Sequence, residues 1–340
     1  MISNVIKFTF FLIKPLLKLL EPEWSHKLTL NFLKTSHKVF KFDFSKNYKK
    51  EDIILFDLKF NNRLGISAGM DKNAEYIDCI GSLGFGFLEL GTVTPKAQPG
   101  NPKPRVFRDY KNNAIINRLG FNNKGVDYAI NNIVKSNYDG VIGLNIGKNL
   151  STTIEKASED YVYCLKKAHK FVNYITVNIS SPNTSNLRKL QSKTFLNDFI
   201  KEILNNNHEL NKENKKKLPI FVKISPDETL NSLELLLNTL VNNKVSGVII
   251  SNTTIYRFPE LPIKFSKETG GLSGKPLFEH SNLCLKNASN ILNNEMPIIA
   301  VGGVENKKTF QTKIELGASL VQVYSGLVFN GPEVITSILN

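Results

Sequence analysis

Eight short apolar segments recur along the chain after residue 60, and polar or glycine-rich residues follow each of them. Most are rich in Val, Ile, Leu and Phe and are too short for a helix, which is typical of buried strands. Stretches with helical spacing lie between most of the segments, for example at 153–170 and 230–242. The pattern predicts strands at 65–68, 87–91, 141–145, 175–179, 220–224, 247–251, 298–302 and 320–324.

Eight strand-then-helix units in about 250 residues predict an α/β protein of the (β/α)8 barrel type, whose active site lies at the C-terminal ends of the strands. The alternative is a doubly wound open sheet, but the first strand–helix turn carries no GxGxxG motif. Residues 53–60 and the turn Asn61-Asn62 predict a hairpin before the first strand. Segment 205–217 is interpreted as a solvated surface connection.

The N-terminal residues predict a first helix at 5–20, which is strongly apolar but is interrupted by Lys7, Lys14, Pro15 and Lys18. A helix that crosses a bilayer needs about 20 predominantly apolar residues, so we expect this one to lie on the bilayer surface. A signal peptide is the competing interpretation. The sequence EPEWSH, however, follows the apolar segment in place of a small-residue cleavage site.

A second helix is predicted to begin near Pro22, because Trp24, Leu28 and Phe32 repeat every four residues and form one apolar face with Leu33. The alternative that both helices simply pack on the main domain stays open at this point. Residues 41–50 are polar and lysine-rich, as in a linker. We therefore predict a membrane-associating helical segment at 1–45 and a catalytic barrel at 46–340.

The 340-residue chain carries a net charge of +14, and residues 1–50 contribute ten lysines against three acidic residues. Because aromatic and aliphatic residues separate these lysines, the basic excess indicates an anionic membrane more than a nucleic acid. The three cysteines, Cys79, Cys164 and Cys284, are far apart and form no CxxC pair. Neither a disulfide framework nor a metal site is predicted, and a reducing compartment is expected.

Unusual residues follow the predicted strands, as the barrel hypothesis requires. Lys223 lies within the apolar segment IFVKIS, where a charge is costly to bury without an anionic partner. Lys72 follows a glycine turn after the first strand. Together with Gly302-Gly303 after the seventh strand, these lysines indicate a phosphorylated cofactor, although a plain turn is the alternative for the two glycines.

The segment that follows the fourth strand is the most polar of these loops. Its sequence, NISSPNTSN, offers many neutral hydrogen-bonding groups and contains no Asp, Glu, His or Cys. Such a loop suits a small, flat, polar ligand. The alternative is an ordinary turn, since Ser, Pro and Asn are common turn residues.

Ten motifs along residues 50–340 resemble the dihydroorotate dehydrogenase family: AGMDKN, GFLELGTVTPKAQPGNPKPRVFR, INRLGFNN, NIGKN, NISSPNTSNLR, KISPD, SNTT, TGGLSGKPL, AVGGV and VQVYSGL. The helical N-terminus with EPEWSH is similar to the extension of the quinone-using, membrane-associated class 2 enzymes. Class 1 enzymes use a cysteine as catalytic base and lack this extension. Ser181 occupies the base position here, which agrees with class 2.

The resemblance implies FMN as cofactor and dihydroorotate as substrate. It implies FMN contacts at Ala68, Gly69, Met70, Asp71, Lys72, Thr92, Asn145, Asn178, Lys223, Ser251, Gly274, Gly303, Tyr324 and Ser325. It implies substrate contacts at Lys72, Asn117, Arg118, Leu119, Gly120, Phe121, Asn178, Asn183, Asn252 and Thr253. Ser251 is a mild departure, because the family usually has threonine there; no metal is implied.

The resemblance also implies a mechanism. Ser181 is expected to remove the C5 proton, and because a hydroxyl is a poor base near neutral pH, it needs a relay, for which Thr184 and a water are the nearest candidates. The loop that carries Ser181 is expected to close over the substrate. A bilayer quinone is expected to enter between the two N-terminal helices, near His26, Arg108 and Tyr324. For His26 the alternative is a surface residue with no such role.

These expectations place the chain in pyrimidine (UMP) biosynthesis, as a peripheral protein on the cytoplasmic face of a bacterial inner membrane, or on the mitochondrial inner membrane. A monomer is favoured, and no nucleic-acid partner is expected. Two rival readings remain. One is an FMN barrel that acts on another pyrimidine or on tRNA, and the other is a membrane adaptor with an inactive barrel.

Overall fold

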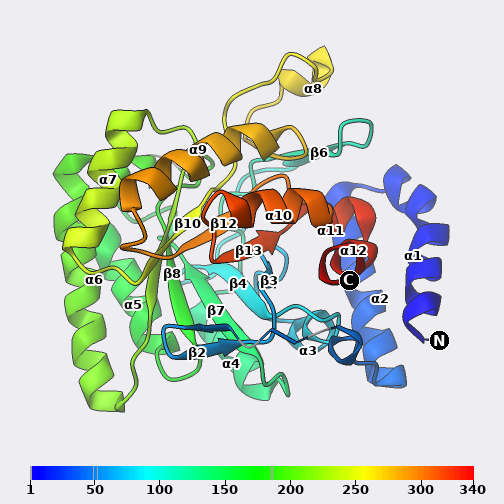
Figure 1. Ribbon diagram of the computed structural model, residues 1–340, viewed down its shortest axis with the longest axis horizontal. Coiled ribbons are helices and arrows are strands. Elements are labelled where there is room, and N and C mark those ends of the chain that lie inside the picture. Colours follow the sequence, from blue (N-terminus) through cyan, green and yellow to red (C-terminus); the bar gives the residue numbers. More distant parts are fainter. Residues whose placement is uncertain (1, 49, 52, 185–186) are drawn as a thin grey trace.

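The computed structural model describes residues 2–48, 50–51, 53–184 and 187–340. Eight parallel strands close into a barrel in which each strand pairs with the next along the chain, and the last pairs with the first. This confirms the predicted (β/α)8 barrel (Figure 1). The barrel strands are β3 (Leu64–Ile66), β4 (Phe87–Val93), β7 (Val141–Ile146), β8 (Tyr174–Asn178), β9 (Ile220–Ile224), β10 (Gly247–Ile250), β12 (Ile298–Val301) and β13 (Leu320–Val323).

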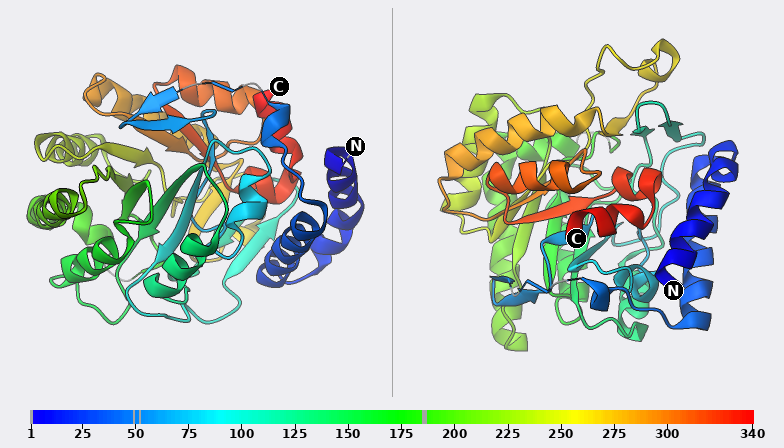
Figure 2. Two further views of the ribbon diagram at one scale, coloured as in Figure 1. Left: turned by 90° about the horizontal axis from the view of Figure 1, so that it is seen from below. Right: turned by 45° about the vertical axis from the view of Figure 1, so that its right-hand side comes forward.

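Helices surround the barrel, as the left view of Figure 2 shows. Each presents an apolar face to the strands; in α7, Leu233, Leu236, Leu237 and Leu240 are buried, and Thr229 caps the first turn by accepting the Ser232 N–H. The helices are α3 (Ile77–Gly81), α4 (Val126–Lys135), α5 (Ala157–Ala168), α6 (Lys193–Asn214), α7 (Leu230–Asn242), α9 (Leu277–Leu292), α10 (Lys307–Glu315), α11 (Ser325–Asn330) and α12 (Glu333–Leu339). A 3-10 turn, η2 (Leu187–Gln191), precedes α6.

An antiparallel hairpin of β1 (Ile53–Leu55) and β2 (Leu58–Phe60) closes the N-terminal end of the barrel. Phe56 packs edge-on against Phe221 inside the barrel, with ring centroids 5.0 Å apart. Ile53 pairs with Phe60, so the chain reverses at Phe56 and Asp57, both at positive φ. The predicted hairpin over residues 53–60 is confirmed, but its turn is not at Asn61-Asn62, which form a bend between β2 and β3. Because the hairpin covers the N-terminal ends of the strands, a ligand site is expected at their C-terminal ends.

Two segments that looked like solvated connections are structured. Residues 205–214 belong to the 22-residue helix α6, and Asn207 is buried and donates to the Leu218 carbonyl at 2.9 Å. Local composition misled here, because tertiary packing of one face outweighs a polar sequence. The predicted linker 41–50 contains η1 (Ser45–Asn47), and its Phe42 and Phe44 are stacked and buried in the main core.

A three-stranded antiparallel sheet lies apart from the barrel sheet and was not predicted. It consists of β5 (Val106–Asp109), β6 (Ala114–Asn117) and β11 (Gly271–Gly274), in the order β11-β6-β5. The segment between β10 and β11, which contains the short helix α8 (Ile263–Ser266), protrudes at the top of Figure 1. The inner face of this sheet packs Ala114, Ile116 and Leu272 into a small separate core.

The predicted N-terminal helices are present as α1 (Ile2–Leu19) and α2 (Pro22–Phe40), which lie side by side on one flank of the barrel in Figures 1 and 2. Glu21 caps α2 by accepting the Glu23 and Trp24 backbone N–H groups. Among the described residues, no helix has both the length and the apolar character that crossing a membrane requires. Large apolar side chains on the two helices remain exposed: Leu12, Leu16, Leu19, Trp24, Leu28, Phe32, Val39 and Phe40.

Candidate active site

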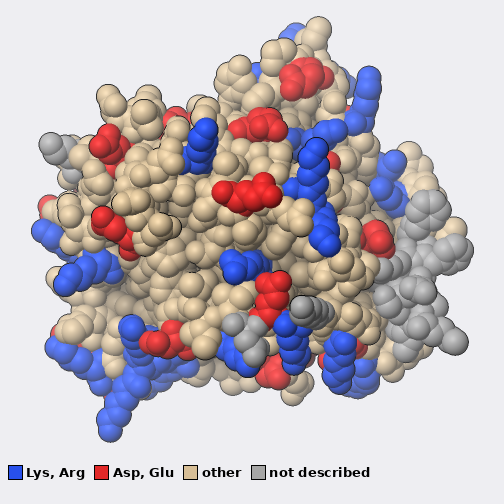
Figure 3. Space-filling model, viewed as in Figure 1, with Lys and Arg blue, Asp and Glu red and all other residues tan. Residues whose placement is uncertain are grey.

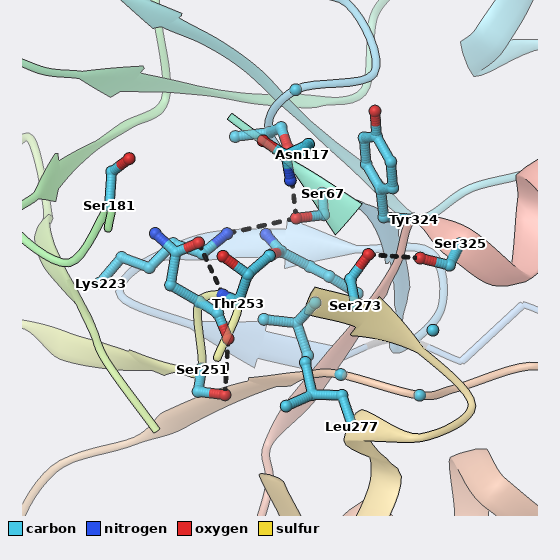
Figure 4. A pocket seen from close by; sticks show the side chains of 18 of the residues that line it. Ser67, Asn117, Ser181, Lys223, Ser251, Thr253, Ser273, Leu277, Tyr324 and Ser325 are labelled. Carbon is cyan, nitrogen blue, oxygen red and sulfur yellow. Dashed lines mark hydrogen bonds between the residues drawn. The ribbon is translucent and has the colours of Figure 1, made fainter. Parts of the chain in front are cut away.

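A cavity of about 140 Å³ opens at the C-terminal ends of the barrel strands (Figure 4). Most of the residues predicted for FMN and dihydroorotate line it, although they lie far apart in the sequence, in strands and in the loops that follow them. Those in the wall are Ala68, Gly69, Lys72, Thr92, Asn117, Leu119, Gly120, Phe121, Asn178, Ser181, Asn183, Lys223, Ser251, Asn252, Thr253, Gly274, Gly303, Tyr324 and Ser325. Their individual roles stay predictions.

Four predicted residues lie outside this wall. Met70 and Asp71 face a second cavity, and Asp71 accepts the Glu75 and Tyr76 backbone N–H groups, while burial raises its pKa to about 6. Arg118 points away, toward the carboxylate of Glu268 at 2.8 Å. Asn145 lies directly beneath the cavity.

A fully buried hydrogen-bond network forms the floor of the cavity. Asn145 accepts from the Thr92 hydroxyl at 2.6 Å and from the Asn178 amide at 3.1 Å, and it donates to Glu89 at 2.8 Å. Gln322 donates to the other Glu89 oxygen at 2.7 Å. Because a carboxylate only accepts, these bonds fix the orientation of both amides. Sequence reasoning missed Glu89, although a carboxylate within the apolar strand FLEL is the same signal that drew attention to Lys223.

Lys223 projects from β9 into the cavity, where its ammonium group lies 3.3 Å from the Ser67 hydroxyl (Figure 4). Burial lowers the pKa of Lys223, and the negative charge of Glu89 opposes that change. Glu89 therefore supplies a negative charge for this buried lysine. The ammonium group of Lys223 nevertheless lies in the wall of the cavity. A cation held in this way is available to a ligand.

Lys72 stands at another edge of the same cavity and donates to the Asn122 side-chain oxygen. Burial first, and then the charge of Arg105, lower the pKa of Lys72 to about 7, while Glu23 acts in the opposite direction. A ligand carboxylate next to Lys72 would therefore favour its charged form.

Ser181 is buried in the wall, and the Asn183 backbone N–H donates to its hydroxyl oxygen at 3.3 Å. The Asn183 side chain donates to Asn117 at 3.2 Å, which ties this loop to β6. The hydroxyl of Thr184 is buried and has no hydrogen-bond partner among the described residues. Ser185, the last serine of the loop predicted from the sequence, lies outside them. An N–H aimed at the Ser181 oxygen would stabilise negative charge there.

A tight glycine turn follows β12. Gly302 and Gly303 both have positive φ, and a Cβ on Gly303 would lie 2.5 Å from Phe278, so only glycine fits. Behind the turn, the fully buried Lys313 donates to the Ser281 hydroxyl at 2.6 Å. The single Ser281 hydroxyl proton is shared between the Phe278 carbonyl at 2.9 Å and the Gly302 carbonyl at 3.1 Å. Burial lowers the pKa of Lys313 to about 7. Sequence analysis did not single out this lysine.

A second cavity of about 530 Å³ lies between the N-terminal helices and the barrel. His26, Arg108 and Tyr324, which were predicted for a quinone tunnel, all line it. Gly69, Lys72, Asn117, Leu119 and Tyr324 line both cavities, so these residues form a common wall. Burial raises the pKa of Tyr324 to about 12, which keeps its hydroxyl protonated.

The polar groups of the second cavity are held by backbone carbonyls. His26 Nε2 lies 2.9 Å from the Met70 carbonyl oxygen, and burial followed by the charge of Lys72 lowers the pKa of His26 to about 4. The imidazole is therefore neutral, and because a carbonyl only accepts, the proton lies on Nε2 and leaves Nδ1 as an acceptor. Arg108 donates to the Leu17 and Leu20 carbonyls, which fixes the end of α1.

Comparison with known proteins identifies the family. A sequence model described as dihydroorotate dehydrogenase matches residues 52–340. The chain belongs to the dihydroorotate dehydrogenase family. It is 43% identical over 326 residues to a dihydroorotate dehydrogenase (quinone) of Acinetobacter baylyi, covering 96% of this chain and 97% of the relative. It is 45% identical over 331 residues to one of Buchnera aphidicola, covering 97% and 98%.

Solved structures of this family agree with the fold. A dihydroorotate dehydrogenase from Eimeria tenella, crystallised with ferulenol, superposes with a TM-score of 0.86 at 34% identity, over 93% of this chain and 89% of that one. Its ligand-free form gives a TM-score of 0.83. The resemblance stated from the sequence motifs is thereby confirmed.

Some lining residues escaped sequence analysis. Asn113, Ser273 and Lys275 come from the unpredicted sheet and its neighbours, whereas Ser67, Glu305 and Gln322 lie in or shortly after barrel strands and were not chosen there. Ser273 of β11 meets Ser325 at 3.0 Å between their hydroxyl oxygens (Figure 4). The motif TGGLSGKPL contained Ser273 and Lys275, but only Gly274 was chosen from it.

Proposed function

We propose that this chain oxidises dihydroorotate to orotate, with FMN as resident cofactor and a membrane quinone as the second electron acceptor, in the de novo synthesis of pyrimidines. The common wall between the two cavities carries this proposal. A single cofactor in the first cavity can meet a polar substrate there and deliver electrons across the wall to an apolar acceptor in the second.

The first cavity fits the chemistry of FMN. Gly302-Gly303 forms a tight turn in the wall, of the kind whose backbone N–H groups hold a phosphate, and Ser325 adds a hydroxyl to the same wall. The ammonium group of Lys223 offers donors to a ring edge, and Asn178 and Thr92 lie in the same wall. The side-chain oxygen of Gln322 is buried without a partner among the described residues, and it is an acceptor for a ring N–H. When bound, FMN supplies hydride acceptance and electron transfer to a quinone.

The residues beside this space suit dihydroorotate. The ammonium group of Lys72 meets the substrate carboxylate, and the side chains of Asn117, Asn178, Asn183 and Asn252 match its amide edges. These groups hold the substrate in one orientation without an acid that would compete for the same donors. The remaining predicted contacts, Leu119 to Phe121 and Thr253, shape the sides of the pocket.

Ser181 takes the proton from C5 of the substrate. The Asn183 N–H stabilises negative charge on the serine oxygen. The Thr184 hydroxyl, which has no partner within the described part of the chain, receives the proton for relay to water. The ammonium group of Lys223, above Glu89, stabilises negative charge on the cofactor ring edge.

The second cavity suits a bilayer quinone. Ile13, Leu17, Leu30 and Val328 supply apolar walls, and neutral His26 offers at Nδ1 an acceptor for a hydroxyl of the quinol product. On the outer face of α1 and α2, the exposed apolar residues would enter the bilayer interface, while the neighbouring lysines meet anionic head groups. We further propose that the protein acts as a monomer on the cytoplasmic face of a bacterial inner membrane, or on the mitochondrial inner membrane.

Anaerobic mixing with dihydroorotate tests the proposal. We expect loss of the visible flavin absorbance with dihydroorotate but not with dihydrouracil, which lacks the carboxylate that Lys72 would bind. Reduction by dihydrouracil alone, or no reduction by either, would overturn it in favour of a different substrate. On the face shown in Figure 3, basic side chains gather along the lower edge, with acidic side chains among them. A tRNA substrate is the less favoured alternative because much of the lysine excess lies in the apolar N-terminal residues.

A further inference from the structure

A buried ion pair joins helix α2 to the loop in front of β5. The carboxylate of Glu23, in the first turn of α2, accepts from Arg105 Nη2 at 2.8 Å and from Arg105 Nε at 3.0 Å. The two side chains are 18% and 8% exposed, and this bidentate geometry is the strong form of such a pair. Burial works against the charged carboxylate, but Arg105 and Lys103 hold the pKa of Glu23 below its usual value.

Arg105 uses its remaining nitrogen to shape its own loop. Arg105 Nη1 donates to the Pro99 carbonyl at 2.6 Å and to the Asn101 carbonyl at 2.8 Å. Each nitrogen of the guanidinium group therefore donates to an oxygen. Removing the Glu23 carboxylate would leave a buried charge uncompensated, which is strongly unfavourable. The conformation of residues 99–105 thus depends on a side chain of α2.

The same loop reaches the residues predicted for substrate. The Asn101 side chain donates to the Arg118 carbonyl at 2.8 Å and to the Asn183 carbonyl at 3.2 Å. A Cβ on Gly120 would lie 2.8 Å from the Asn101 side chain, so the two are packed closely. Asn183 in turn donates its backbone N–H to the Ser181 oxygen. An unbroken series of contacts therefore leads from α2 to the catalytic serine.

We propose that Glu23 is a positioning residue for dihydroorotate oxidation: through Arg105 and Asn101 it holds the loop of Ser181 and Asn183 in its reactive position. This inference rests on the proposed function. Because α2 also lines the second cavity, its position couples the two sites. Such a coupling is reciprocal, so substrate binding would favour the seated position of α2.

Charge reinforces this coupling at Lys72. The charged groups that act on Lys72 are Arg105 from the loop and Glu23 from α2. His26, the other titratable group near Lys72, is neutral because its pKa is lowered to about 4. Arg105 lowers the pKa of Lys72 and Glu23 raises it. Neutralising Glu23 would therefore move the pKa of Lys72 further down and weaken its hold on a substrate carboxylate as the pH rises.

The test is stopped-flow reduction of the FMN-loaded, full-length protein by dihydroorotate, followed from about pH 6 to pH 9. We expect Glu23→Gln to slow saturated reduction on the order of tenfold and to shift the pH dependence of dihydroorotate affinity to lower pH. Asn101→Ala should slow reduction similarly without that shift, since it leaves the ion pair intact. Lys103→Gln is the matched control, because its exposed ammonium group lies 3.8 Å from Glu23.

A double-mutant cycle with Arg105→Gln decides the route. If Glu23 acts through Arg105, the double variant Glu23→Gln/Arg105→Gln should reduce FMN at a rate within twofold of that of Arg105→Gln alone. If Glu23→Gln is reduced at the parent rate and loses only thermal stability or quinone reoxidation, Glu23 is a local anchor of α2 and the inference is wrong. A parent protein that dihydroorotate does not reduce would instead refute the proposed function.

Discussion

The two cavities differ in how they are built. The first is small and is lined by many polar side chains, and strand ends and their loops fix its groups through the network of Glu89, Asn145 and Asn178. The second is larger and mostly apolar, and helices α1 and α2 supply one side of it. The barrel thus provides the groups for chemistry, whereas the added helices provide access for an apolar partner. The predictions below test how far this division holds.

Ser181→Ala should have the largest effect. Loss of the proposed base should slow flavin reduction by dihydroorotate by about 10²–10⁴-fold, while FMN stays bound because the cofactor contacts lie elsewhere. Anaerobic stopped-flow absorbance measures the rate, and the flavin content of the purified variant is the control. Near-normal reduction would move the base to another group.

The pH dependence of the parent protein separates two groups in the first cavity. The saturated rate should rise with pH, because deprotonation of Ser181 becomes easier. Dihydroorotate affinity should fall above about pH 7, because the pKa of Lys72 is lowered to about 7 and the ammonium group loses its proton there. A flat rate from about pH 6 to pH 9 would count against serine as base.

Deleting residues 1–40 should remove the second cavity's outer side and leave the barrel folded, since all eight barrel strands follow residue 60. Quinone reoxidation and vesicle attachment should be lost, and dihydroorotate should still reduce FMN. That reduction should be slower than in the parent, on the order of tenfold, because Arg105 loses Glu23. Vesicle co-sedimentation and stopped-flow reoxidation with a lipophilic quinone measure the two losses.

A matched variant separates the membrane contact from the shape of the cavity. Leu16 and Leu19 are exposed on α1, at 65% and 84%, and neither lines the second cavity. Leu16→Glu with Leu19→Glu should weaken vesicle binding at least tenfold, since burying each leucine contributes about 1.5–3 kcal/mol, and should leave flavin reduction unchanged. Unaltered sedimentation would show that α1 packs on the barrel without entering a bilayer.

Lys223→Ala tests the cation of the first cavity. The variant lacks the positive charge that opposes Glu89 and that would stabilise anionic reduced flavin. The flavin reduction potential should therefore fall, and FMN should be retained less well. Redox titration against a reference dye and the flavin content after gel filtration measure both. Unchanged values would make Lys223 a structural residue.

The sequence predicted the barrel well because its signals are local. Each strand is a short apolar segment, and the chemistry-bearing residues follow it directly, so one pattern located both the fold and most of the first cavity. The sheet of β5, β6 and β11 escaped because β11 pairs with β6 across more than 150 residues of chain, and only the folded structure reveals that pairing.

Side chains that interact across long stretches of sequence could not be predicted either, because only the folded structure brings them together. Glu23 and Arg105 are separated by 82 residues, and each looks like an ordinary surface charge. Lys313 occurs in the polar helix α10 among other lysines and gave no pattern, yet it is fully buried. A buried lysine there is unfavourable for folding alone, which suggests a role at the glycine turn.

Lys313→Met should give the smallest effect. It tests whether burial of this lysine lowers the stability of the fold. The pKa of Lys313 is lowered in the fold to about 7 from 10.5, so the folded state binds its proton less well than the unfolded state. The resulting penalty is complete below about pH 7 and disappears toward pH 10.5. The cofactor-free variant should therefore unfold at a temperature about 2–6 °C higher near pH 6, with the gain shrinking as the pH rises.

The same variant should bind FMN more weakly, because Lys313 no longer supports the Gly302 carbonyl through Ser281. Lys308→Met, on the exposed side of the same helix, is the matched control and should change neither property. Differential scanning fluorimetry across pH and flavin fluorescence titration measure the two effects. If the variant is instead less stable at every pH and its FMN affinity is unchanged, the hydrogen bond from Lys313 to Ser281 stabilises the fold. Lys313 would then not lower stability for the sake of the first cavity.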